Sequence, residues 1–115
     1  MKRVIVETPY AGDVQKNLRY LRVCMRDCLL RGESPFASHG LYTQPGVLDD
    51  SIPEEREAGI VAGFVWRYVA SMTVVYTDLG ISRGMQLGIE HSQKIGVRVE
   101  MRQLDNWAEP DKATR

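Results

Sequence analysis

The residues best suited to chemistry form a turn between an apolar run and a helix-like segment. The sequence Asp78-Leu79-Gly80-Ile81-Ser82-Arg83-Gly84 directly follows the largely apolar residues 72–77. Gly80 lets the backbone approach a ligand closely. Free amide groups of a helix that starts near Ser82 favour a phosphate or another anion. The turn therefore predicts a nucleotide-like ligand, with Asp78, Ser82 and Gly84 among its contacts, although helix capping and a tight turn would use the same residue types.

Two other segments place polar and aromatic groups after predicted strands. Pro9-Tyr10-Ala11-Gly12-Asp13 ends the first apolar run, and a long loop covers residues 39–50. Tyr10 and Tyr42 could stack on a base or merely cover apolar surface. His39 could carry a proton for a reaction, or it could be an ordinary hydrogen-bonded histidine. Pro9 and Gly12 would shape the turn beside the ligand.

The elements that must position these groups alternate between strand and helix. Apolar periodicity predicts helices over residues 14–31, about 52–68 and about 82–94. Short apolar or β-branched runs predict strands over residues 2–8, 34–38, 72–77 and 97–101. Such alternation indicates a three-layer α/β sandwich whose parallel sheet, of about four to five strands, has helices on both faces. Ligands bind beyond the carboxyl ends of such strands, so the three polar segments should converge on one cleft.

Length and composition narrow the function classes. The 115 residues suit one domain, which we place at residues 1–104 with a polar tail at 105–115. Fifteen basic and fifteen acidic residues cancel, which argues against general nucleic-acid binding. No apolar run is long enough for a signal peptide or a membrane span, so we expect a cytoplasmic protein without a membrane partner. Cys24 and Cys28 are expected to be reduced core residues, and neither a metal site nor a cofactor is predicted.

The sequence resembles the nucleoside 2-deoxyribosyltransferase-like superfamily, in particular its short members from bacteriophages and bacteria. The resemblance depends on the opening strand with Pro9-Tyr10-Ala11-Gly12, on residues 74–80, and on Gly84-Met85-Gln86-Leu87-Gly88. It implies a flavodoxin-like, Rossmann-like sandwich and a homo-oligomer. It also implies cleavage of the bond between a nucleobase and deoxyribose, in which a helix glutamate attacks the anomeric carbon and strand-end acids assist.

The catalytic pattern departs from the family at its central position. The family's glutamate falls at Gln86, whose neutral amide is a poor nucleophile, while Asp78 matches a strand-end acid. Glu90 lies one turn after Gln86 on the same face of the predicted helix, at a distance of about 6 Å. The resemblance therefore supports the fold more strongly than the mechanism.

Three functions remain open from the sequence. The first is a protein that binds a nucleoside, nucleotide or nucleotide-derived signal through a degenerate glycosyltransferase-type centre, for instance a phage protein that sequesters or modifies such a signal. The second is an active N-glycosidase or deoxyribosyltransferase that uses Asp78 or Glu90, with His39 as proton carrier. The third is an oligomeric interaction module without a ligand, which would use Gly59, Gly63 and the 40–50 loop.

Overall fold

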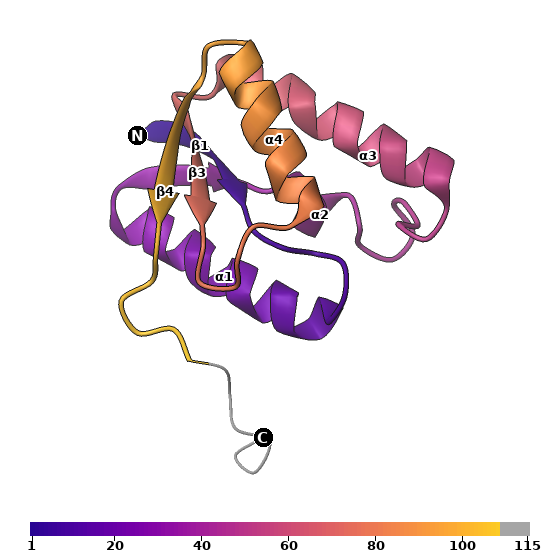
Figure 1. Cartoon of the computed structure of the whole chain (residues 1–115), viewed down its shortest axis with the longest axis horizontal. Coiled ribbons are helices and arrows are strands. Elements are labelled where there is room, and N and C mark those ends of the chain that lie inside the picture. Colours follow the sequence, from indigo (N-terminus) through magenta and orange to yellow (C-terminus); the bar gives the residue numbers. More distant parts are fainter. Residues whose placement is uncertain (109–115) are drawn as a thin grey trace.

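The computed structural model describes residues 1–108, which form a four-stranded parallel sheet between two layers of helices (Figure 1). The strands are β1 (Lys2–Glu7), β2 (Glu33–Phe36), β3 (Met72–Tyr76) and β4 (Arg98–Arg102), in the spatial order β2-β1-β3-β4. The longer helices are α1 (Val14–Leu30), α3 (Pro53–Val65) and α4 (Arg83–Lys94). The predicted flavodoxin/Rossmann-like α/β sandwich is confirmed, with four strands.

The central strands are built from β-branched and apolar residues that both helical layers cover. All five residues of β3 are buried, as are Val4, Ile5 and Val6 of β1. The register pairs Val4 with Met72 and Val6 with Val74. This burial on both faces explains why the sequence of each strand is a continuous apolar run rather than an alternating one.

The helices divide between the two faces of the sheet. Figure 1 shows α1 on one face and α3 with α4 on the other. Asp13 caps α1 by accepting a hydrogen bond from the backbone amide of Lys16, at 3.2 Å. Ser82 caps α4 through Met85 in the same way, at 3.3 Å. The connection that leaves β1 lies on one face of the sheet and the connection that enters β3 lies on the other. The crevice for a ligand is therefore expected at the carboxyl ends of these two neighbouring strands.

The segment between β2 and β3 is more structured than the sequence predicted. The expected strand over residues 34–38 ends at Phe36, and the expected loop begins with a one-turn helix, α2 (Ser38–Leu41). Gly63 lies against Ser38 and Gly59 lies against Leu48, so the two glycines allow α2 and the following loop to pack closely on α3. The expected helix over residues 52–68 is α3 followed by a 3₁₀ turn, η1 (Trp66–Val69).

The core between α1 and the sheet holds both cysteines as free, buried thiols, as predicted. Trp107 packs edge-on against Tyr20, with ring centroids 4.9 Å apart, which anchors the segment after β4. The rest of the predicted tail, residues 109–115, lies outside the described residues. Among residues 1–108, none of the helices has the length and apolar character needed to cross a membrane.

Candidate functional site

A cavity of about 200 Å³ opens beyond the carboxyl ends of β1 and β3. One water molecule needs only about 10–15 Å³ of such space, so the cavity can hold a multi-atom ligand. Its walls include Tyr10, the 38–50 segment, the inner side of α3 and the start of α4. Parts of all three predicted polar segments therefore line one cavity, while other parts of the first and third do not.

A buried ion pair forms the floor of this cavity. Glu7 ends β1, Arg67 lies in η1, and Oε2 of Glu7 accepts a hydrogen bond from Nη2 of Arg67. Nε of Arg67 donates to the hydroxyl group of Ser92 at 3.1 Å. Burial raises the pKa of Glu7 to about 7, although the Arg67 guanidinium acts in the opposite direction. Such a carboxyl group can accept a hydrogen bond or hold a proton near neutral pH.

His39 lies beside this floor as a neutral imidazole. Its Nε2 is 2.6 Å from the hydroxyl group of Thr8, and both residues line the cavity. Burial lowers the pKa of His39 to about 4, and the positive charge of Arg67 acts in the same direction. At neutral pH the ring therefore lacks the extra proton that a general acid would donate.

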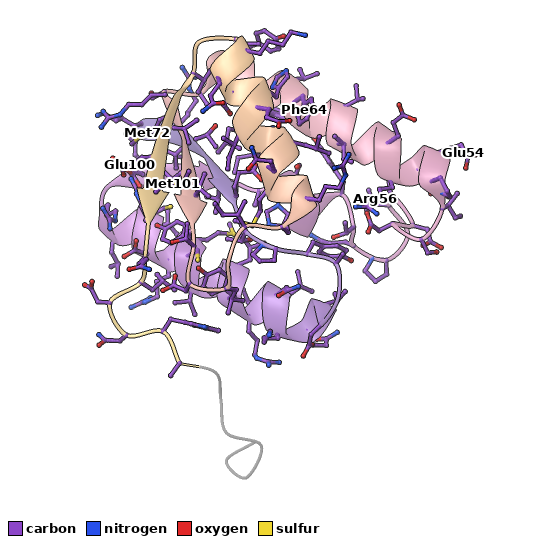
Figure 2. All side chains as sticks on the ribbon, viewed as in Figure 1. Glu54, Arg56, Phe64, Met72, Glu100 and Met101 are labelled. Atoms are coloured by element: carbon purple, nitrogen blue, oxygen red, sulfur yellow. The ribbon has the colours of Figure 1, made fainter. Side chains whose placement is uncertain are left out.

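Two exposed arginines lie at the rim of the cavity. Arg56 comes from the first half of α3, where Figure 2 shows it beyond Phe64 along the helix, and Arg83 begins α4. Neither arginine forms a salt bridge within the described residues. Ser82 and Gly84, two of the predicted ligand contacts, line the cavity next to Arg83. The first turn of α4 and the two guanidinium groups together make this rim suitable for an anion.

The two predicted tyrosines also line the cavity. The hydroxyl group of Tyr42 accepts a hydrogen bond from Nε1 of Trp66 at 2.9 Å, which fixes the ring against η1. Phe64 adds a third aromatic wall between α3 and α4, where it stacks on His91 at a centroid distance of 4.1 Å (Figure 2). Flat apolar walls of this kind suit a planar ligand group.

Several predicted site residues lie elsewhere. The carboxylate of Asp78 accepts hydrogen bonds from the Tyr20 hydroxyl group at 2.5 Å and from the Leu104 amide at 3.1 Å, so it ties β3 to α1 and to the segment after β4. Gln86 and Glu90 are exposed on α4 and do not line the cavity. Pro9 and Gly80 line a shallower groove on the α1 side, and Gly12 lines another beside the 43–51 loop.

The ion pair at the cavity floor was not among the residues that sequence patterns predicted. Arg67 is the only charged residue between Glu57 and Asp78, and an isolated charge in an apolar run is usually buried with a partner. Glu7 likewise ends an apolar strand at the edge where ligands bind. These two signals could have identified the pair, although not its geometry.

No cluster of three or more histidine, cysteine or acidic side chains within residues 1–108 is arranged to hold a metal ion. Comparison with curated proteins finds no match. A family model described as a domain of unknown function, DUF7768, matches residues 2–102, which extend from the start of β1 to the end of β4. The chain therefore belongs to the DUF7768 family.

Proposed function

We propose that this protein binds a nucleoside phosphate or a related nucleotide-derived ligand in the cavity beyond β1 and β3. The observation that carries the proposal is the division of the cavity into a polar floor at Glu7 and Arg67, aromatic walls, and a rim with two arginines that form no salt bridge within residues 1–108. The planar base fits between the walls, while the phosphate suits Arg56, Arg83 and the first turn of α4. The resemblance to the nucleoside 2-deoxyribosyltransferase-like superfamily favours the same ligand class.

The test is a thermal-shift and calorimetric titration of the protein with nucleosides, nucleoside mono- and triphosphates, dinucleotides and cyclic ADP-ribose-type compounds. A ligand that binds only the folded state raises the melting temperature once its concentration exceeds its dissociation constant. Replacing both Arg56 and Arg83 by alanine is expected to weaken phosphate binding by about 10- to 100-fold, because hydrogen bonds between charged groups are strong.

The matched control replaces Arg22 and Arg26 by alanine. These arginines are exposed on α1 and lie outside the cavity, so their loss changes the net charge equally without touching the rim. Equal weakening by both double variants would contradict the proposed rim. If none of these compounds raises the melting temperature of the protein, the proposed function is contradicted.

An active N-glycosidase or deoxyribosyltransferase is the second candidate, and Glu7 is the observation that favours it. Its buried carboxyl group faces the cavity, whereas Gln86 and Glu90 do not. Prolonged incubation of each bound nucleotide, followed by chromatography for free base, separates the two candidates. Intact nucleotide supports the binding protein, and released base supports the enzyme.

We also propose a cytoplasmic, homo-oligomeric protein, in host cytoplasm if a phage encodes it. Exposed apolar side chains on α3 and η1, including Val61, Val65 and Tyr68, support self-association. Light scattering of the purified protein tests the oligomeric state.

A further inference from the structure

The ion pair at the cavity floor leaves one carboxylate oxygen and one guanidinium nitrogen without a hydrogen-bond partner among residues 1–108. Oε2 of Glu7 is bonded to Arg67, but Oε1 has no hydrogen-bond partner within the described residues. Nη1 of Arg67 also has no hydrogen-bond partner within residues 1–108, because Nε donates to Ser92 and Nη2 donates to Glu7. Neither atom is among the completely buried, unsatisfied polar atoms of residues 1–108. Both residues line the cavity, so this is where the two atoms can meet a ligand.

The surrounding structure packs closely around the pair. A side chain at Gly88 would overlap both the Glu7 carboxylate and the Arg67 guanidinium, so the missing Cβ makes room for the pair beneath α4. The Arg67 guanidinium also lies over the Phe64 ring, 5.0 Å from its centroid. Arg67 is 3% exposed and Glu7 is 8% exposed, so a ligand would reach them only at the bottom of the cavity.

A buried ion pair is weak grounds for a purely stabilising role, because desolvation offsets the attraction between the charges. A carboxylate acceptor and a guanidinium donor that line one cavity can instead match the hydrogen-bonding edge of a nucleobase. Every natural base carries hydrogen-bond donors and acceptors side by side along one flat edge. A phosphate group or a sugar ring does not present donors and acceptors in one plane, so neither fits between aromatic walls in the same way.

We propose that the Glu7–Arg67 pair recognises the hydrogen-bonding edge of the base, so that a nucleotide enters this cavity base first with its phosphate at Arg56 and Arg83. The inference rests on the proposed function. It assigns base specificity to Glu7 and Arg67, which the sequence patterns did not single out. It assigns no such role to Asp78 or Gln86.

The test compares ligands on the unmodified protein by calorimetry. Ribose 5-phosphate and deoxyribose 5-phosphate are titrated beside the nucleoside monophosphates and beside analogues that lack one edge group, such as inosine monophosphate for guanosine monophosphate. We expect the best nucleotide to bind at least about 10-fold more tightly than the sugar phosphates. Loss of an edge group that contacts the pair is expected to weaken binding by about 10- to 100-fold, because a buried polar group is then left unpaired.

A variant pair sharpens the assignment. Glu7→Gln retains the shape of the side chain but replaces one acceptor by a donor, so discrimination between each nucleotide and its analogue should fall toward 1-fold. Glu33→Gln is the matched control, because Glu33 belongs to another buried ion pair and lies outside the cavity. If Glu7→Gln fails to fold, as judged by circular dichroism, the analogue series on the unmodified protein decides.

The two proposals fail in different ways. Sugar phosphates that bind as tightly as the best nucleotide would overturn base recognition and leave phosphate binding intact. Unchanged discrimination in folded Glu7→Gln would also overturn it. Failure of every nucleotide and sugar phosphate to bind would overturn the proposed function as well.

Discussion

Two buried arginines, each paired with a glutamate, lie on opposite faces of the sheet and differ in how fully their hydrogen bonds are used. Arg102 lies on the α1 side and binds Glu33 through two bonds of 2.6 and 2.7 Å. It also donates to Glu100 at 2.6 Å and to the Tyr76 hydroxyl group at 3.3 Å. Arg67, on the α4 side, shares one bond with Glu7 and retains a free donor within residues 1–108.

Burial alone does not distinguish the two pairs. Both arginine side chains are 4% exposed, and the glutamates are 9% exposed at Glu33 and 10% at Glu7. The pKa values of the two glutamates, however, shift in opposite directions. Hydrogen bonds from Arg102 hold the pKa of Glu33 below its usual value, whereas burial raises the pKa of Glu7. A fully bonded pair is suited to fixing the fold, and an incompletely bonded pair beside a cavity is suited to meeting a ligand.

The largest effect on stability is expected at Arg102. Replacing it by methionine leaves Glu33, Glu100 and the Tyr76 hydroxyl group without their shared donor, which should cost about 3–5 kcal/mol of unfolding free energy. Urea denaturation measures this loss. Arg98→Met is the control, since that side chain is 70% exposed and its loss should change stability by no more than about 0.5 kcal/mol. Equal losses of stability at both positions would contradict the conclusion that the Arg102–Glu33 pair fixes the fold.

Gly88→Ala should disturb only the cavity pair. The added methyl group overlaps Glu7 and Arg67, and such overpacking typically costs about 1–3 kcal/mol. In Gly84→Ala, one turn earlier in α4, the added methyl group would lie 4.0 Å from the Ser82 hydroxyl oxygen, an ordinary contact, and should instead stabilise the helix by up to about 1 kcal/mol. Urea denaturation of both variants provides the comparison, and a stabilised Gly88→Ala would contradict the close packing described above.

Glu7 and His39 should give opposite dependences of stability on pH. The raised pKa of Glu7 contributes stability that is complete below pH 4.5 and is lost as the pH rises to about 7. The lowered pKa of His39 contributes stability that is complete above pH 6.5 and is lost as the pH falls to about 4. In the unmodified protein these two trends largely cancel between pH 4.5 and 6.5.

Single variants expose each trend. Stability of His39→Gln should fall as the pH rises through this window, and stability of Glu7→Gln should rise, each by at most about 1.4 kcal/mol per pH unit. Urea titrations at several pH values measure both slopes. Two variants with the same sign of slope would show that the floor is not protonated as described.

The smallest effects are expected on the outer face of α4. Gln86→Ala and Glu90→Ala remove exposed side chains outside the cavity, so each should change unfolding free energy by no more than about 0.5 kcal/mol and leave nucleotide affinity unchanged. Calorimetric titration with the best nucleotide checks this. A large loss of affinity would return the site to the helix position that the superfamily resemblance suggested.

The sequence predicted the fold well because strands and helices follow local patterns. The apolar run of β3, the stripe of α1 and the caps at Asp13 and Ser82 are each visible within a few residues. The same alternation indicated that parts of the three polar segments would lie near one edge of the sheet. Contacts between residues far apart in the sequence could not be predicted, because no local pattern indicates which side chain will form a hydrogen bond with a given carboxylate. Asp78 is bound by Tyr20 from 58 positions away, and Glu7 pairs with Arg67 from 60 positions away.

The packing of α2 on α3 has a consequence for how this protein can diversify. Residues 38–64 form one contiguous stretch that carries His39, Tyr42, Arg56 and Phe64, whereas Glu7 and Arg67 lie outside it. Because this stretch connects β2 to β3, replacing its residues should change the aromatic walls and one of the two rim arginines, while β1 and η1 keep Glu7 and Arg67 in place.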